Sequence, residues 1–214
     1  FSRSGKTVWV KDQGIVRDRG GIFRYIQVVM SDITLERENK DVLVKQALHD
    51  GLTDLPNRSL LIERLGHVMR RAERHPEITY ALLFLDLDGF KSVNDQFGHA
   101  SGDQVLIETA ARIQSCAREF DTVARFGGDE FVVLVEDPKD VAALRMIVDR
   151  IQAEIRRPFD IHGHEVRLSA SIGMVCCEEK FLDPLEMIHA ADVMMYRVKM
   201  EFKAQQRLME QSES

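Results

Sequence analysis

The chain has 214 residues, of which 44% are hydrophobic and 30% are charged, and its formal net charge is −6 at pH 7. This composition is typical of a soluble globular protein, and the length allows one well-formed core plus a smaller additional part. The acidic balance excludes broad, non-specific binding to a DNA or RNA polymer, because nucleic-acid phosphates would be repelled. A single nucleotide remains compatible with this charge, since a metal ion and a few basic groups neutralise one triphosphate locally.

The three cysteines fit neither a disulfide framework nor a zinc site, so we expect a reducing, cytoplasmic environment. The longest purely apolar stretch, Tyr80 to Leu85, is far too short to cross a bilayer, and no signal peptide is visible. We therefore expect no membrane contact within these residues. Because the chain begins with Phe1 rather than methionine, we expect a fragment, which leaves an upstream membrane segment open.

The first 34 residues are predicted to form strands. Two runs of strand-forming residues, Thr7–Val10 and Ile22–Met30, flank a hairpin signal at Arg19-Gly20-Gly21. Two strands alone are marginal in water, so this part is expected to need partners. Residues 35–50 are highly charged with a weak apolar stripe, and they are predicted to form a linker helix. Such a helix either pairs with its copy in a dimer or is a solvated linker, and barely two heptads do not decide between these.

From Gly51 onward the pattern alternates between helix and strand, and Ser101 is predicted to cap a helix. The predicted helices are Leu60–Glu73, Ser101–Arg118, Val141–Ile155 and Leu185–Lys203, and the predicted strands are Tyr80–Leu87, Val123–Phe126, Phe131–Val135 and Val166–Val175. The expected fold class is α+β, in which helices flank a mostly antiparallel central sheet, with the N-terminal hairpin and the linker helix in addition.

Acidic side chains occur at two strand ends. Asp86 and Asp88 are two positions apart at the end of an apolar strand, so both are expected to point to the same side of the sheet. Gly127-Gly128 predicts a tight hairpin that carries Asp129 and Glu130 at its tip. If these strands are neighbours, their carboxylates suit Mg²⁺, which binds through one or two carboxylates plus substrate phosphates.

Either motif alone has an ordinary explanation. Acidic pairs often lie in solvated loops, and Gly-Gly-Asp is common in turns. The two motifs together, each bounded by apolar strands of suitable length, are considerably more specific.

Several further motifs occur in the order found in one known family. They are Asp50–Arg58, Asp86–Asp95, Phe97–His99, Gly102-Asp103, Arg125–Phe131, Ser171–Gly173, and Ala191-Asp192 with Tyr196 and Lys199. Over roughly residues 46–205 the chain thereby resembles the GGDEF-domain diguanylate cyclases, which condense two GTP molecules into cyclic di-GMP and two pyrophosphates. The resemblance implies a nucleotidyl-cyclase or palm-like sheet, and a homodimer in which each copy holds one GTP.

The resemblance also implies the catalytic centre. Asp86 and Asp129, with the main-chain carbonyl of Leu87, would bind Mg²⁺ or Mn²⁺, two ions per active site. Glu130 would deprotonate the ribose 3′-hydroxyl that attacks the α-phosphate, unless a metal ion does so instead. The implied catalytic residues are therefore Glu130, Asp129 and Asp86.

Other positions match substrate contacts of the family. Asn94 and Asp103 would read guanine through an amide and a carboxylate. Backbone amides near Gly89 and Phe90, together with Lys199, would bind phosphate oxygens.

The end of the last predicted helix departs from the family. Lys203 stands where an arginine is usual, and Phe202 replaces a glycine. Lysine keeps the charge for phosphate binding but lacks the bidentate fork of arginine, so GTP affinity or turnover is expected to be reduced.

An Arg-x-x-Asp motif, Arg118 with Asp121, precedes the GGDEF signature at the spacing of the family's inhibitory product site. Taken alone, it would be interpreted as a surface ion pair of little energetic value. The spacing favours binding of cyclic di-GMP, with Arg145 and Arg150 of a neighbouring subunit as candidate partners.

The resulting domain prediction has four parts. Residues 1–34 resemble the last strands of a PAS sensor, residues 35–50 are the linker helix, residues 51–205 are the cyclase domain and residues 206–214 are a tail. One alternative is a catalytically silent domain that binds GTP or cyclic di-GMP as a signalling module. Another is a different nucleotidyl cyclase or a polymerase-palm enzyme, which would share the metal carboxylates but would not need Asn94, Asp103 or the Arg-x-x-Asp motif.

Overall fold

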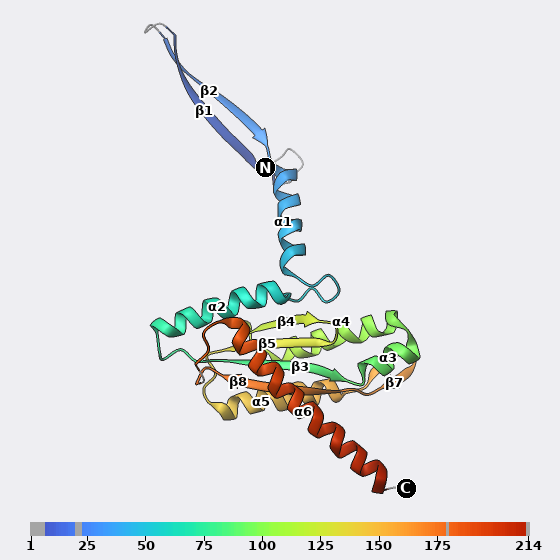
Figure 1. Cartoon of the computed structure of the whole chain (residues 1–214). Helices are drawn as coiled ribbons and strands as arrows, with labels where there is room; N and C mark the ends of the chain where they lie inside the picture. The colour runs from blue at the N-terminus through green and yellow to red at the C-terminus, as the bar shows by residue number, and fades with distance from the viewer. Residues whose placement is uncertain (1–6, 20–22, 179, 213–214) are drawn as a thin grey trace. The chain divides into compact units, whose positions relative to one another are not determined.

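The computed structural model describes residues 7–19, 23–178 and 180–212, and the chain divides into two compact units, Phe1–Ala47 and Leu48–Ser214. In the first unit, strand β1 (Val10–Arg19) pairs antiparallel with β2 (Phe23–Asp32), and helix α1 (Thr34–Leu48) follows (Figure 1). The predicted turn residues 20 and 21 lie outside the described residues.

The start of α1 is tied to the start of the hairpin. The backbone N–H of Trp9 donates to Thr34 Oγ1 over 2.9 Å, and the guanidinium of Arg37 lies 3.8 Å from the centre of the Trp9 ring. Such a cation–π contact is typically worth about 0.5–1 kcal/mol at an exposed site. The hairpin and the first turn of the helix are therefore linked locally.

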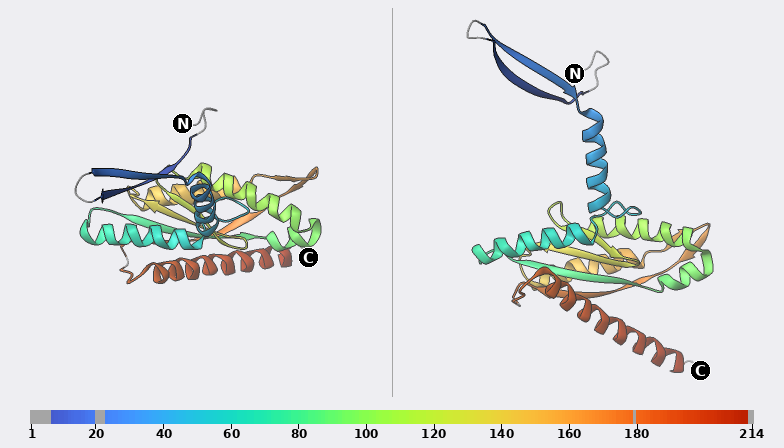
Figure 2. Two further views of the ribbon diagram at one scale, coloured as in Figure 1. Left: turned by 90° about the horizontal axis from the view of Figure 1, so that it is seen from above. Right: turned by 45° about the horizontal axis from the view of Figure 1, so that its top comes forward.

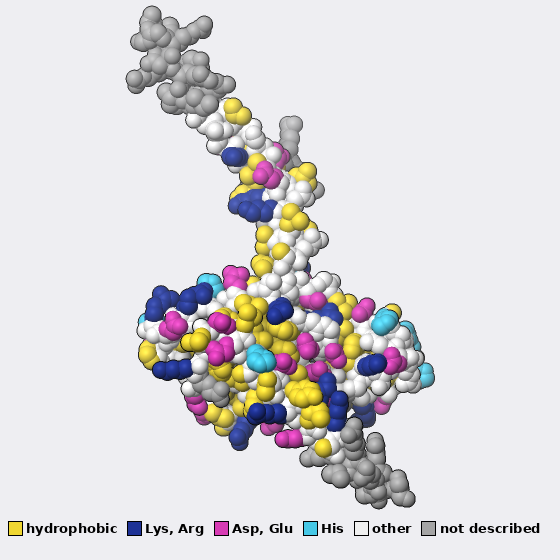
Figure 3. All heavy atoms as spheres, in the orientation of Figure 1, with side chains coloured by type: hydrophobic (Ala, Val, Ile, Leu, Met, Phe, Trp, Pro, Cys, Tyr) yellow, Lys and Arg dark blue, Asp and Glu magenta, His cyan; other side chains and the backbone are white. Residues whose placement is uncertain are grey.

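Helix α1 carries apolar side chains that its own unit does not cover. Leu35, Val42, Leu43 and Val44 are all exposed, and Figure 3 shows hydrophobic side chains on the surface of this helix. Leu35 and Val42 are seven residues apart, which is the spacing of one seam of a coiled coil.

The second unit contains a four-stranded sheet in the order β4-β5-β3-β8, and each neighbouring pair is antiparallel. Its strands are β3 (Tyr80–Asp88), β4 (Thr122–Gly127), β5 (Glu130–Glu136) and β8 (Ser169–Cys176), and a separate hairpin is formed by β6 (Phe159–Ile161) and β7 (His164–Val166). Its helices are α2 (Arg58–Arg74), α3 (Phe90–Phe97), α4 (His99–Cys116), α5 (Val141–Arg156) and α6 (Pro184–Ser212). This arrangement confirms the predicted α+β class.

Helices cover both faces of the sheet, as the two views of Figure 2 show. The strand β3 lies at the centre, and alternation along it divides the core: Leu82 and Phe84 pack with α2 and α6, whereas Leu83 and Leu85 pack with α4 and α5. The last residues of β3 therefore lie at one end of a well-packed sheet, and Asp86 and Asp88 are among them.

The structure corrects several sequence predictions. Ser101 does not cap a helix: α4 begins at His99, and the Ser101 hydroxyl donates to the carbonyl of Phe97 over 2.9 Å from inside the helix. The cap position is Gly98, whose φ of 82° separates α4 from the short helix α3, which was not predicted. The strand predicted from Val166 begins only at Ser169, and α6 continues past Lys203 to Ser212.

None of the helices in the described part of the chain is both long enough and apolar enough to span a membrane.

Candidate active site at the end of the central strands

The two acidic motifs meet where β3 ends and β5 begins. This end of the sheet is the acidic edge. In the ladder between β3 and β5, Asp86 is the partner of Glu130, and the backbone N–H of Leu87 donates to the carbonyl of Asp129 over 3.3 Å. The turn between β4 and β5 places Asp129 at its tip, because Gly128 adopts a φ of 52° that favours glycine. Residues more than forty positions apart in the chain thus lie side by side.

Crowded negative charge perturbs these acids. Burial, followed by the charge of Asp86, raises the pKa of Asp129. Burial also raises the pKa of Glu130, with smaller contributions from Asp86, Asp192 and Asp129. An edge with this much like charge needs a cation to stabilise the ionised forms.

Lys199 of α6 supplies one such cation. Its ammonium donates a hydrogen bond to Asp86 Oδ1. Burial alone would lower the pKa of Lys199, but the hydrogen bond and charge of Asp86, with the charges of Asp88 and Asp129, raise it. Lys199 is therefore firmly protonated within the acidic edge.

The donor set at this edge fits a divalent cation that arrives with a phosphate ligand. The carboxylates of Asp86 and Asp129 and the carbonyl of Leu87 are hard oxygen ligands. Across the described ranges, no group of three or more His, Cys, Asp or Glu side chains is placed to hold a metal ion. Mg²⁺ typically takes only one or two carboxylates and fills its other positions with water and substrate phosphates, so this sparse set suits it.

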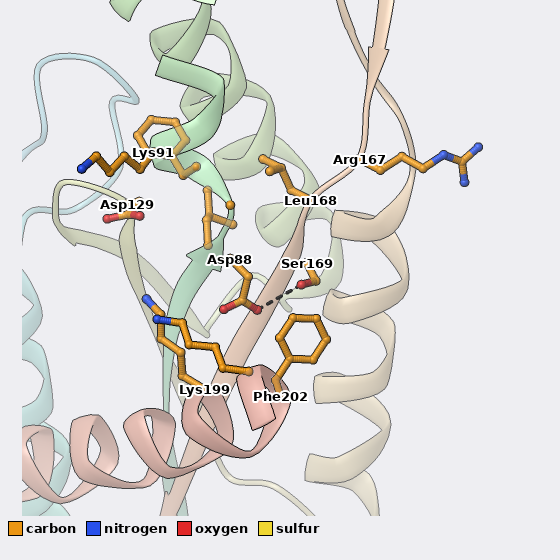
Figure 4. Close-up of a pocket in the computed structure, with 12 residues that line it drawn as sticks. Asp88, Lys91, Asp129, Arg167, Leu168, Ser169, Lys199 and Phe202 are labelled. Carbon is orange, nitrogen blue, oxygen red and sulfur yellow. Dashed lines mark hydrogen bonds between the residues drawn. The ribbon is translucent and has the colours of Figure 1, made fainter. Parts of the chain in front are cut away.

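An open pocket of about 550 Å³ lies beside the acids, and Figure 4 shows the residues that line it. Its lining includes these predicted site residues: Leu87, Gly89, Phe90, Asp129, Lys199 and Lys203. Lys199 reaches from α6 toward the acids, whereas Arg167 points away from them. Acidic side chains (Asp88 and Asp129) and basic side chains (Lys91, Lys199 and Lys203) therefore line the same pocket, a combination that suits a triphosphate with a divalent cation.

The backbone at the start of α3 is also suited to phosphate. Gly89 occupies the cap position with a φ of 87°, and the structure shows no side-chain cap of this helix among the residues it describes. The first amides of a helix lack intrahelical acceptors, so those of Phe90 and Lys91 are donors available to an anion.

Asp88 has a role that its sequence position did not reveal. Its carboxylate accepts from the Ser169 hydroxyl over 3.0 Å and from the Ser171 hydroxyl over 2.9 Å, and both serines lie on β8. Asp86 and Asp88 point to the same side of the sheet, as predicted, and this is the side that α6 covers. Asp88 hydrogen-bonds to β8, whereas Asp86 hydrogen-bonds to Lys199. This division depends on the register of β3 against β8, which no local motif encodes.

Other predicted residues lie around rather than in this pocket. Glu130 lines a neighbouring pocket of about 290 Å³ together with Arg58, Phe126, His189 and Asp192, among others.

Asn94 is half-buried on α3, and Asp103 is exposed on α4. Gly102 permits this arrangement, because a Cβ added to it would lie 2.0 Å from Asn94 Oδ1.

The Arg-x-x-Asp segment forms a tight turn after α4. The Asp121 carboxylate accepts from the backbone N–H of Arg118 over 2.8 Å and from that of Glu136 over 3.2 Å, and Asp121 is only 9% exposed. Asp121 is thus engaged in backbone hydrogen bonds rather than in the surface ion pair considered above. Arg118 and Asp121 line a pocket of about 390 Å³.

Several basic residues of the same unit lie near this turn. Arg150 donates to the carbonyl of Cys116 within the same unit, so its guanidinium links α5 to α4. Arg64, Arg71 and Arg74 of α2 line an adjacent pocket of about 480 Å³. These three arginines lie on one face of α2. Their helical spacing is visible in the sequence, but a cationic surface was not predicted from it.

The chain is similar to known proteins over most of its length. Residues 47–205 match the family model described as "Diguanylate cyclase, GGDEF domain". The chain is 46% identical over 168 residues to the bifunctional diguanylate cyclase/cyclic di-GMP phosphodiesterase MucR of Pseudomonas aeruginosa, an alignment that covers 78% of this chain and 24% of MucR. It is 42% identical over 177 residues to the diguanylate cyclase TpbB of the same species, covering 82% of this chain and 40% of TpbB.

Solved structures show the same likeness. The GGDEF domain of TpbB superposes with a TM-score of 0.68 at 42% identity, covering 72% of this chain and 89% of that chain. The coiled coil and GGDEF domain of DgcB from Caulobacter crescentus, solved in complex with c-di-GMP, gives 0.71 at 26% identity, covering 79% of this chain and 89% of that chain. The chain spans less than half the length of the curated relatives MucR and TpbB. The acidic edge, the hairpin tip and the strand order agree with this likeness. The chain belongs to the GGDEF domain family of diguanylate cyclases.

Proposed function

We propose that this chain condenses two GTP molecules into cyclic di-GMP, with release of two pyrophosphates. The observation that carries the proposal is the convergence of Asp86 and Asp129 beside a pocket with cationic and backbone phosphate donors. The family match and the named cyclases among its relatives support the same reaction.

In the proposed complex the chain's own groups position the triphosphate. Lys199, Lys203 and the first amides of α3 hold its oxygens, which lowers the entropic cost of bringing the reacting atoms together. Asp86, Asp129 and the Leu87 carbonyl hold Mg²⁺ or Mn²⁺, with two ions per site. The bound metal supplies Lewis-acid stabilisation of charge on the α-phosphate.

Glu130 is the proposed acceptor of the ribose 3′-hydroxyl proton. Its raised pKa makes its carboxylate a stronger base than an exposed glutamate, and its position at the start of β5 places it beside Asp86. The environment of Glu130 and its place in the motif both support this proposed role.

Guanine recognition is proposed for Asn94 and Asp103. They lie on the consecutive helices α3 and α4, and Gly102 brings the Asn94 side chain against the backbone just before Asp103. An amide and a carboxylate so placed offer the acceptors and the donor that the Watson–Crick edge of guanine requires.

A homodimer is proposed as the catalytic species, because each domain holds one GTP and the hydroxyl of one must reach the α-phosphate of the other. The exposed apolar residues of α1 are the proposed contact between copies. The hairpin before α1 is proposed to be the C-terminal part of a PAS-like sensor domain, which would transmit a signal through the helix. Arg118 and Asp121, which line one pocket, are the proposed product-inhibition site. That a relative, DgcB, was solved in complex with c-di-GMP supports product binding by the domain in general.

The test is incubation of purified protein with GTP and Mg²⁺, with the products separated by chromatography and the oligomer monitored by light scattering. We expect cyclic di-GMP to form, at a rate that rises more steeply than linearly with protein concentration below the dimerisation constant. Absence of a cyclic dinucleotide from a dimeric sample would contradict the proposal and favour the silent signalling domain. That alternative predicts binding of GTP or cyclic di-GMP without turnover.

A further inference from the structure

The contact between Lys199 and Asp86 creates a conflict within the proposed active site. The ammonium bonds to Asp86 Oδ1, an oxygen of a carboxylate that must also serve the metal ion. The pair is largely shielded from solvent, with side-chain exposures of 23% for Lys199 and 12% for Asp86. An ion pair with this little solvent contact is screened less by salt than a surface pair.

Lys199 also lines the pocket proposed for the triphosphate. One ammonium cannot neutralise Asp86 and contact a phosphate of the nucleotide with full strength at the same time. The site therefore has two arrangements of charge: in one Lys199 balances the acids, and in the other a divalent cation balances the acids while Lys199 balances phosphate.

We propose that Lys199 is an internal counter-ion that blocks Asp86 until a nucleotide draws it away, so that metal and nucleotide bind cooperatively. The inference rests on the proposed function, since it assigns Asp86 to the metal and Lys199 to the phosphates. It adds a condition that the family resemblance does not contain: the empty site resists a bare divalent cation.

The physical reason lies in what each ligand must displace. A metal ion alone must separate Lys199 from Asp86 and leaves the ammonium beside a new positive charge without an anionic partner. A triphosphate provides that partner, so the cost of breaking the pair is largely recovered. A ligand that shifts such an equilibrium acts through its different affinity for the two arrangements, and the resulting coupling is reciprocal.

The first test is titration with Mn²⁺ alone, followed by electron paramagnetic resonance, on wild type and on Lys199→Met. We expect the variant to bind Mn²⁺ alone about fivefold or more tightly, which is the lower range of typical coupling between sites. A non-hydrolysable GTP analogue should strengthen Mn²⁺ binding markedly in wild type and much less in the variant. Equal Mn²⁺ affinity in both proteins, or unchanged coupling to the analogue, would overturn the inference.

Two matched variants separate release of Asp86 from a general loss of positive charge. Lys203→Met removes a cation from the same pocket lining, and within the described residues the structure pairs Lys203 with no carboxylate. It should change the affinity for Mn²⁺ alone by less than about twofold, because an exposed charge is screened. Lys199→Arg keeps a cation and should stay resistant to Mn²⁺. An increase in Lys203→Met as large as that in Lys199→Met would contradict the specific role of Lys199.

A second measurement uses only the wild-type protein, so it remains possible if the Lys199→Met variant does not fold. Lysines of the wild-type protein are acetylated briefly, and the labelling of Lys199 is quantified by mass spectrometry against that of Lys139, which is exposed and lies outside the pockets described above. Lys199 should be protected in the metal-free protein, reactive with saturating Mn²⁺ alone, and protected again with Mn²⁺ and the GTP analogue. Labelling of Lys199 that does not respond to Mn²⁺ alone would overturn the inference.

The outcomes separate the inference from the proposed function. Cyclic di-GMP formation by wild type with unchanged Mn²⁺ affinity in Lys199→Met would remove the counter-ion role and leave the cyclase. Failure of wild type to form product, with tighter Mn²⁺ binding in Lys199→Met, would support the counter-ion role and remove the cyclase.

Discussion

Arg125 Nη1 lies 2.9 Å from Asp50 Oδ1, while the Nε and Nη2 atoms of the same guanidinium donate to the carbonyl of Gly128 over 3.0 and 2.8 Å. One side chain thus joins the segment that opens the second unit to the hairpin tip that carries Asp129. Asp50 is itself fixed by Thr53, whose backbone N–H and hydroxyl donate to it over 2.9 and 2.7 Å. Because both ends of the link are held, we expect a displacement of Asp50 to displace the tip as well.

Asp50→Asn should therefore weaken catalysis although Asp50 lies outside the active site. We expect stability to fall by about 1–3 kcal/mol, since a hydrogen bond to a charged group is lost, and kcat to fall more than the affinity for GTP. Steady-state kinetics and chemical denaturation measure the two effects. Wild-type turnover in a destabilised Asp50→Asn protein would show that the link to Arg125 is purely structural.

The same ion pair predicts a dependence of stability on pH. Burial opposes ionisation of Asp50, but hydrogen bonds from Thr53 and Arg125 lower its pKa below the ordinary value of 3.8. A carboxylate with a lowered folded pKa stabilises the protein above its unfolded pKa, and this contribution is lost as pH falls through the folded value. The stability difference between wild type and Asp50→Asn should therefore be constant from neutral pH to about pH 5 and shrink below pH 3.8. A difference that stays constant down to pH 2 would contradict the assignment.

Gly102→Ala should impair guanine recognition through Asn94. The added Cβ would lie 2.0 Å from Asn94 Oδ1 and 3.2 Å from the Phe90 ring, so the amide must rotate away. We expect KM for GTP to rise about tenfold, at a stability cost of roughly 1–3 kcal/mol typical of overpacking. Gly51→Ala is a matched control, because no atom lies within 4 Å of the position that its Cβ would take. An unchanged KM in Gly102→Ala would show that Asn94 does not read the base.

Gly173→Ala should disrupt the docking of α6 against β8. Its Cβ would lie 2.2 Å from the backbone N of Met195 and 2.3 Å from the carbonyl of Ala191, and neither atom can yield without moving the helix. We expect a loss above about 2 kcal/mol in the free energy of unfolding, together with loss of activity because α6 carries Lys199. Denaturant unfolding and the cyclase assay provide the measurement. Near-wild-type stability would mean that α6 can shift freely over the sheet.

Arg118→Ala and Asp121→Ala should behave differently although they belong to one motif. Arg118 is proposed to contact product, so its loss should raise steady-state cyclic di-GMP with little change in stability. Asp121 caps two backbone N–H groups from a buried position, so Asp121→Ala should cost about 1–3 kcal/mol as well. Product-binding calorimetry and denaturation of both variants measure this. Unchanged product affinity in Arg118→Ala would remove the inhibitory site.

Much of this architecture could be predicted from the sequence, because its signals are local. The long apolar run of β3, the turn at Gly127-Gly128 before Asp129 and the main helices are all encoded in consecutive residues. The short helix α3 was missed because it follows Gly89 directly and is separated from α4 by Gly98 alone. The hairpin of β6 and β7 has three residues per strand, too few for a periodic pattern.

The site was predicted less completely, for a physical reason. Convergence of Asp86 and Asp129 required only that β3 and β5 be neighbours. The serines of β8 donate hydrogen bonds to Asp88, and Lys199 donates one to Asp86. These contacts depend on strand register and on how α6 crosses the sheet. Contacts of this kind join residues far apart in sequence, so they become visible only once the chain is folded.

The most direct test of the account is Mn²⁺ binding in the presence of a non-hydrolysable GTP analogue, measured for wild type, Asp86→Asn, Asp129→Asn and the double variant. The two acids are proposed to hold the same metal cluster, so each single variant should lose most of the affinity and the double variant should lose little more. Fully additive losses, or tight Mn²⁺ binding in either single variant, would contradict a shared metal site at the edge of the sheet.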